Sequence, residues 1–260
     1  MASLRTVLIT GASSGIGRAL AHLFARDGYA LVLAARRLEV LRSLQVELTT
    51  TSRVPVRCLR ADLSTHDGAD LLHADLLREG LTIDVLVNNA GVGMQGAFVQ
   101  LPLSDQLQMM TLNMLSLTTL TGLLVPGMMQ RRHGGVLNVG STAAFQPGPF
   151  MAVYYATKAY VVSFSEALAD ELDGSGVVVS CLAPGPTETS FAVTAGANRS
   201  RLFQGDVMTA AEVARIGYDG WRRGKPLVIA GRSNRVKQLL TRVLPRRYVR
   251  DAVRRLNTAE

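Results

Sequence analysis

A glycine-rich run at the end of the first apolar segment constrains the fold of this chain more than any other feature. The apolar residues Val7 to Ile9 lead into TGASSGIG at residues 10–17, and a helical pattern begins at Arg18. Glycines lack Cβ, so the backbone can turn sharply and approach a pyrophosphate, toward which the new helix points its free N–H groups. The spacing is G-x-x-x-G-x-G rather than G-x-G-x-x-G. The run predicts a nucleotide-phosphate site, with a purely structural turn as the alternative.

Strand-length apolar runs alternate with helical patterns along most of the chain. These runs are continuously apolar, which indicates burial on both faces and therefore a parallel sheet. Successive right-handed βαβ units predict one Rossmann-like, doubly wound α/β domain of about seven strands over residues 1–231. The expected strands are residues 6–10, 30–34, 54–59, 85–88, 136–139, 177–182 and 227–230. We expect the segment 189–206 to form a substrate loop at the carboxyl edge of the sheet.

Composition indicates a globular protein, and the distribution of charge argues against a nucleic-acid-binding one. A hydrophobic content of 48% with 18% charged residues is typical of a globular protein. Residues 1–221 carry 16 Lys and Arg against 18 Asp and Glu, whereas residues 222–260 carry 12 against 2. The basicity therefore belongs to the tail, and the nearly neutral body argues against nucleic-acid binding.

Cysteine and histidine usage gives no sign of a metal site. Cys58 and Cys181 lie inside expected strands, where they are typical of small buried hydrophobes in a reducing compartment. The chain has no CxxC motif, and its histidines, at positions 22, 66, 73 and 133, lack ligand spacing. We expect no metal and a cytoplasmic location, because no leader precedes the first strand and no apolar run approaches the ~18 residues of a membrane span.

Tyr154 and Lys158 stand four residues apart at the head of a long helical pattern. This spacing places the phenol and the ammonium on one face of the helix. A tyrosine with a pKa near 10 is a poor acid or base at neutral pH, and a nearby lysine lowers that pKa by favouring the phenolate. The pair is therefore a candidate for proton transfer to or from a substrate oxygen, although a surface lysine beside a half-buried tyrosine is the alternative.

Further motifs accompany this pair in a fixed order. They are Asp62-Leu63, NNAG at residues 88–91, Asn113, Ser141 thirteen residues before Tyr154, YYATK at residues 154–158, and Pro184-Gly185. With TGASSGIG, they make the chain resemble the single-domain branch of the short-chain dehydrogenase/reductase family, of about 250 residues, from about residue 6 to residue 231.

The resemblance implies an NAD(P)(H)-dependent oxidoreductase that interconverts a carbonyl and a secondary alcohol. Tyr154 would be the general acid in reduction and the general base in oxidation, and Ser141 would stabilise charge on the substrate oxygen. Lys158 would lower the tyrosine pKa and bind the nicotinamide ribose, and Asn113 would hold a helix irregularity and a relay water. Thr142 could partly substitute for Ser141. A non-catalytic dinucleotide sensor or scaffold on the same fold is the alternative, and a homodimer or homotetramer is expected.

The resemblance also places the cofactor. Besides Tyr154 and Lys158, the implied cofactor-binding residues are Gly11, Ser13, Ser14, Gly15, Ile16, Gly17, Arg36, Asp62, Leu63, Asn89, Ala90, Gly91, Pro184, Gly185, Thr187 and Thr189. An NAD-specific site carries an Asp or Glu at the end of the second strand, where this chain has Ala35 followed by Arg36. A guanidinium can hold a 2′-phosphate, so NADP(H) is favoured over NAD(H). Ser14 departs from many NADP-preferring relatives, which have a basic residue there, and a solvated pair of strand-end arginines is the alternative.

The segments expected to surround the substrate are apolar. They contribute Met94, Phe145, Phe150, Met151, Tyr155, Phe191 and Phe203, which favours an apolar ketone or alcohol, although some of these residues could belong to the core. Arg199 and Arg201 could instead serve a carboxylate.

The charge and the apolar periodicity of residues 232–260 predict a basic helical extension. Apolar residues recur at helical spacing on both sides of Pro245, with nine basic and two acidic residues in the segment. Two amphipathic, cationic helices are expected. We favour packing of their apolar stripes on the same subunit or on an oligomer partner, with weak contact to an anionic membrane as the alternative.

Overall fold

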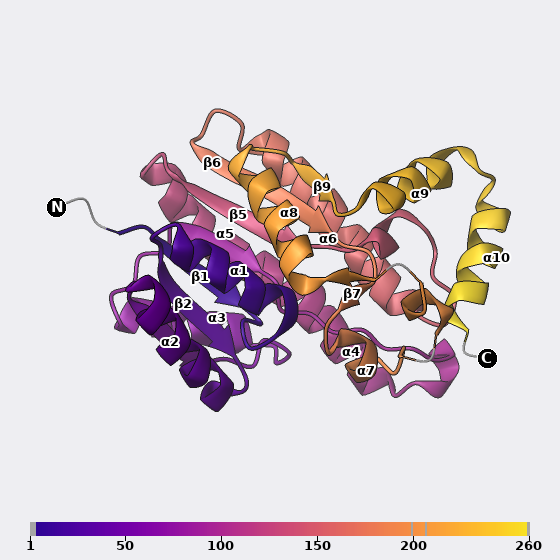
Figure 1. The fold of residues 1–260 in the computed structure, drawn as a ribbon, viewed down its shortest axis with the longest axis horizontal. Helices are drawn as coiled ribbons and strands as arrows, with labels where there is room; N and C mark the ends of the chain where they lie inside the picture. The colour runs from indigo at the N-terminus through magenta and orange to yellow at the C-terminus, as the bar shows by residue number, and fades with distance from the viewer. Residues whose placement is uncertain (1–3, 199, 206, 259–260) are drawn as a thin grey trace.

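Seven parallel strands form the central sheet in a computed structural model that describes residues 4–198, 200–205 and 207–258 (Figure 1). The strand order is β3-β2-β1-β4-β5-β6-β9, so the chain starts in the middle and builds outward in both directions. The strands are β1 Thr6–Thr10, β2 Ala30–Ala35, β3 Val56–Arg60, β4 Val85–Asn88, β5 Gly134–Val139, β6 Val177–Ala183 and β9 Leu227–Ile229. The predicted α/β fold is confirmed. The third strand begins two residues later than expected, after Pro55, which has no N–H to donate to a neighbour.

Helices cover both faces of the sheet. On one face lie α1 Gly15–Arg26, α2 Leu38–Ser52 and α8 Ala210–Arg222, and on the other lie α3 Gly68–Arg78, α5 Ser116–Gln130 and α6 Ala152–Glu171. Alternate residues of β1 enter opposite cores: Val7 and Ile9 pack with the first group and Leu8 packs with the second. This burial on both faces explains why the strands are continuously apolar.

A single long helix runs from α4 Leu103–Met110 through the π-helical turn η2 Thr111–Leu115 into α5. By length and composition it is apolar enough to cross a membrane, with a mean hydropathy of 1.3 over its most apolar window, contrary to the expectation from contiguous apolar runs. Leu120 and Met128 are nevertheless fully buried against the sheet. We therefore assign this helix to the core of the domain.

The segment that follows β6 contains short elements rather than a plain loop. These are β7 Thr187–Glu188, α7 Phe191–Thr194, the 3-10 turn η4 Arg201–Phe203 and β8 Met208–Thr209, which pairs with β7. Two further 3-10 turns, η1 Phe98–Gln100 and η3 Thr142–Phe145, follow β4 and β5. All of these elements follow the carboxyl ends of strands, where a parallel sheet binds its ligands.

The basic extension forms the two predicted helices, α9 Arg232–Val243 and α10 Arg246–Asn257, separated at Pro245. They lie at the end of the molecule opposite the N-terminus in Figure 1. Val249 and Val253 of α10 are buried in a small cluster with Met151 and Tyr155. The apolar residues of α9, in contrast, face solvent.

Candidate active site

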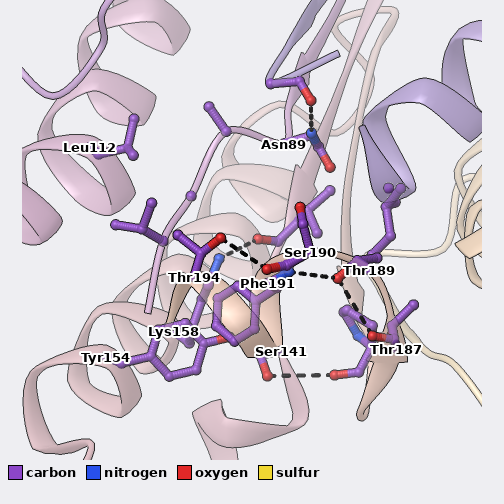
Figure 2. A pocket seen from close by; sticks show the side chains of 18 of the residues that line it. Asn89, Leu112, Ser141, Tyr154, Lys158, Thr187, Thr189, Ser190, Phe191 and Thr194 are labelled. Atoms are coloured by element: carbon purple, nitrogen blue, oxygen red, sulfur yellow. Dashed lines mark hydrogen bonds between the residues drawn. The ribbon is translucent and has the colours of Figure 1, made fainter. Parts of the chain in front are cut away.

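A cavity of about 580 Å³ lies at the carboxyl edge of the sheet. All of the predicted cofactor and catalytic residues line it except Gly17 and Asn113. Figure 2 shows Tyr154, Lys158 and Ser141 gathered near Phe191, with Thr187, Thr189 and Ser190 beside them. Predicted residues from seven segments of the sequence therefore meet in one cavity at this edge of the sheet.

The glycine loop leaves the N-terminus of α1 open to an anion. No side chain caps this helix, and its first turn contains no acidic residue. Gly15 has a φ of +54°, and a Cβ there would lie 2.9 Å from Thr189 across the cavity. The loop therefore has the free N–H groups and the close backbone approach that a pyrophosphate needs.

Thr10 and Asn89 brace the glycine loop, and Thr10 was not among the predicted site residues. The Asn89 side chain donates to the carbonyls of Thr10 and Gly11, at 2.9 and 3.1 Å. The Thr10 hydroxyl accepts from the backbone N–H groups of Asn89 and Ala90, both at 3.0 Å. Gly17 lies under this brace, because a Cβ there would collide with the Asn89 amide. Thr10 ends a buried strand and is the first residue of the TGASSGIG run.

The end of β2 carries two exposed arginines into the cavity lining, Arg36 and Arg37. Arg37 donates to the Ser13 hydroxyl at 3.2 Å, which joins this strand end to the glycine loop. Asp62 faces the same region. Burial raises its pKa, but hydrogen bonds from Ser64 and the charge of Arg36 outweigh that effect and lower the pKa below its usual value. The residues present fit the adenosine end of a nicotinamide dinucleotide.

Tyr154 and Lys158 share one face of α6, as their spacing predicted. Both side chains are buried. The Lys158 ammonium lies 5.9 Å from the centre of the Tyr154 ring and donates to the Val139 carbonyl at 2.8 Å. Gly91 lies beside this pair, since a Cβ there would sit 3.2 Å from the Asn113 side-chain oxygen and 3.5 Å from the Lys158 nitrogen.

Burial controls the protonation of both groups. It raises the pKa of Tyr154 well above 10, and interaction with the Ser141 hydroxyl only partly opposes this effect. Burial also lowers the pKa of Lys158 to about 8. Tyr154 is therefore a phenol at neutral pH, and Lys158 loses its charge far more readily than an exposed lysine.

Asn113 lies behind the cavity in the π-helical turn η2. Its side-chain amide donates to the Val92 carbonyl at 2.9 Å and to the Thr157 hydroxyl at 3.1 Å, and its oxygen accepts from the Val92 N–H at 3.0 Å. Thr157 in turn donates to the Tyr154 carbonyl at 2.7 Å. The predicted helix irregularity is present, and it connects the segment after β4 to the helix of Tyr154.

The substrate end of the cavity has an apolar wall. Of the expected residues, Met151, Tyr155, Phe191 and Phe203 line it, and the Phe191 ring lies 5.2 Å from the Tyr154 ring. The expectation was wrong for Met94, Phe145 and Phe150, which do not line the cavity. Gln146, Thr194 and Leu202 line it and were not expected, because they come from short segments without a motif. Arg199 lies outside the described residues, and Arg201 is absent from the lining.

Comparison with known proteins identifies the family. The model of the short chain dehydrogenase family matches residues 5–200. A sulfoacetaldehyde reductase from Chromohalobacter salexigens is 41% identical over 213 residues, which cover 79% of this chain and 83% of that protein. A very-long-chain 3-oxoacyl-CoA reductase from Pyrenophora tritici-repentis is 35% identical over 67% of this chain, a match that spans about half (52%) of the relative.

Solved structures agree with this assignment. A short-chain dehydrogenase from Sphingobium yanoikuyae in complex with NADPH is 35% identical, with a TM-score of 0.82 over 93% of this chain and 97% of that one. A bulky-bulky ketone specific alcohol dehydrogenase from Comamonas testosteroni is 31% identical, with a TM-score of 0.77 over 93% of this chain and 95% of that one. The chain belongs to the short-chain dehydrogenase/reductase family, and it is an NAD(P)-binding oxidoreductase that acts on CH–OH groups.

Proposed function

We propose that this protein reduces apolar, uncharged ketones with NADPH. The apolar wall of Met151, Tyr155, Phe191, Leu202 and Phe203 carries the proposal, because it lines the same cavity as Tyr154, and the Phe191 ring packs against the Tyr154 ring. The likeness to an alcohol dehydrogenase specific for bulky-bulky ketones supports the same substrate class.

In the proposed reaction, the glycine loop and Lys158 would hold the nicotinamide cofactor, which when bound would supply a hydride to the carbonyl carbon. Tyr154 donates its phenolic proton to the carbonyl oxygen, which becomes the alcohol oxygen. Ser141 donates a hydrogen bond to the same oxygen and stabilises the charge that develops there. Lys158 stabilises the phenolate left on Tyr154 and would also hold the ribose hydroxyls. Burial raises the pKa of Tyr154, so its phenolic proton is present at neutral pH, and the charge of Lys158 has to offset the cost of forming the buried phenolate.

The preference for NADPH rests on the end of β2. Arg36 and Arg37 line the cavity there, and Ala35 stands where an NAD-specific site would place a carboxylate. A 2′-phosphate would gain a charge-assisted partner and meet no acidic side chain at that position. The likeness to a short-chain dehydrogenase in complex with NADPH supports this preference. The cytoplasmic location and the homodimer or homotetramer stay predictions.

An NADPH-consumption screen tests the substrate class. The panel contains aliphatic, aromatic, steroid and acyl-thioester ketones, together with a sugar, a small keto acid and sulfoacetaldehyde. We expect neutral apolar ketones to have the highest kcat/KM. Among the described residues, the basic ones that line the cavity are Arg36, Arg37 and Lys158, so a sulfonate or carboxylate at the substrate end would lack an arginine partner. A clear preference for charged substrates or sugars would overturn the proposal.

A further inference from the structure

Helix α9 turns its apolar side chains away from the rest of the protein. Val236, Leu239, Leu240 and Val243 are 57%, 59%, 47% and 77% exposed. Their spacing places them on one face of the helix. The opposite face is polar and packs inward, where Gln238 is buried. This orientation is the reverse of an ordinary surface helix, so the apolar stripe has no partner among the described residues.

Basic residues surround this stripe. Residues 232–258 contain nine Lys and Arg and a single acidic residue, Asp251, which lies 3.6 Å from Arg250. At 100° per residue, Arg235 and Arg242 flank the stripe on one side and Lys237 flanks it on the other. The surface therefore combines exposed aliphatic side chains with a strong positive charge.

We propose that α9 and α10 form a docking surface for an anionic lipid membrane. The aliphatic stripe of α9 enters the boundary between headgroups and acyl chains, and the flanking basic side chains bind the anionic headgroups. Charge complementarity selects this occupant over a second copy of the chain, because two copies would bring a net charge of +8 on each face together. The aliphatic centre of the surface selects a lipid over a nucleic acid, which offers anionic phosphates but no acyl region.

The docking surface adjoins the substrate end of the cavity. Helix α9 packs against η3, and α10 packs against η4, which carries the cavity-lining residues Leu202 and Phe203. A membrane bound here would lie beside elements that contribute to the substrate end of the cavity. Docking itself does not depend on the proposed reaction, so it is measured without turnover.

Co-sedimentation with vesicles tests the proposal. The full chain is mixed with vesicles of phosphatidylcholine alone or of phosphatidylcholine with phosphatidylglycerol, at low and at high salt. Leu239→Ser/Val243→Ser removes two apolar side chains from the stripe, and Val46→Ser/Leu77→Ser, on α2 and α3, is the matched control because those side chains are 67% and 66% exposed. Lys237→Gln/Arg242→Gln removes two charges, and Arg57→Gln/Arg78→Gln removes two elsewhere.

We expect binding to the anionic vesicles to be at least about tenfold tighter than to phosphatidylcholine alone, and to weaken at high salt. Each α9 double variant weakens it by about tenfold or more, since one basic side chain near an anionic surface contributes about a fivefold gain. The two control variants bind like the unchanged protein, and all variants keep its melting temperature.

Three results would overturn the proposal. The first is equal or absent binding to the two kinds of vesicle. The second is an oligomer that Leu239→Ser/Val243→Ser dissociates in sedimentation equilibrium while vesicle binding is absent, which would assign the stripe to a second copy of the chain. The third is tighter binding to duplex DNA or RNA than to anionic vesicles at the same salt concentration.

Discussion

The side-chain oxygen of Asn257, at the end of α10, accepts a hydrogen bond from the hydroxyl of Tyr155 at 3.2 Å. The side-chain nitrogen of Asn257 donates to the Pro149 carbonyl at 2.9 Å. Asn257 is only 1% exposed, so water cannot replace these bonds. One residue near the end of the chain therefore holds both the loop that enters α6 and a tyrosine of the substrate wall, next to Tyr154.

Replacing Asn257 by Ala tests this role. The change leaves the Tyr155 hydroxyl and the Pro149 carbonyl without partners in a buried place, which costs about 1–3 kcal/mol for each group. We expect a lower melting temperature and a KM for bulky ketones that rises more than kcat falls. Thr258→Ala is the control, because the Thr258 hydroxyl bonds only to carbonyls of its own helix. An unchanged melting temperature and unchanged KM for Asn257→Ala would show that α10 does not position the substrate wall.

Replacing Tyr154 by Phe tests the proton donor. The variant keeps the ring that packs against Phe191 and loses only the hydroxyl. Because general acid catalysis contributes about 10²–10⁴ in rate, we expect kcat for ketone reduction to fall by that factor. NADPH binding, followed by fluorescence, should change little. Reduction at the original rate would remove Tyr154 from the mechanism.

The elements and motifs that local sequence determines were predictable. The strands were found because parallel strands buried on both faces are continuously apolar, and Tyr154 and Lys158 were found because their spacing is a local motif. Ser141 was found only through the resemblance to the family. Asn257 escaped notice because its partners, Pro149 and Tyr155, lie more than a hundred residues away in the sequence.

The orientation of an amphipathic helix is also hidden from the sequence. The periodicity of α9 and of α10 predicted two helices, and packing of their apolar stripes on the same subunit or on an oligomer partner was favoured. Val253 of α10 is buried as expected, whereas Val243 of α9 is 77% exposed. Periodicity determines which residues share a face, but only the packing of the whole chain determines where that face points.

The rate of reduction should depend on the protonation of Lys158. Burial lowers its pKa to about 8, so the side chain is cationic below that pH and neutral above it. The cation stabilises the phenolate that forms when Tyr154 gives up its proton, and we therefore expect kcat/KM to be level at neutral pH and to fall above about pH 8. Alcohol oxidation should instead increase with pH, because Tyr154 must first be deprotonated and its pKa is raised. A reduction profile that stays level to about pH 10 would contradict the role of the lysine charge.

The preference for NADPH should depend on Arg36. Replacing it by Leu removes a charge-assisted partner of the 2′-phosphate, which is worth about 1.5–3 kcal/mol, or roughly 10–150-fold in affinity. Binding of NADPH should weaken by that factor, while binding of NADH, which lacks the phosphate, should hardly change.

The double change Ala35→Asp/Arg36→Leu places a carboxylate at the end of β2, where it can accept hydrogen bonds from the ribose hydroxyls and repel the phosphate. We expect this variant to prefer NADH. Fluorescence titration of both cofactors measures these affinities, with Arg57→Gln on β3 as a control for net charge. Equal affinities for NADPH and NADH in the unchanged protein would show that the strand-end arginines are solvated side chains without a role in cofactor choice.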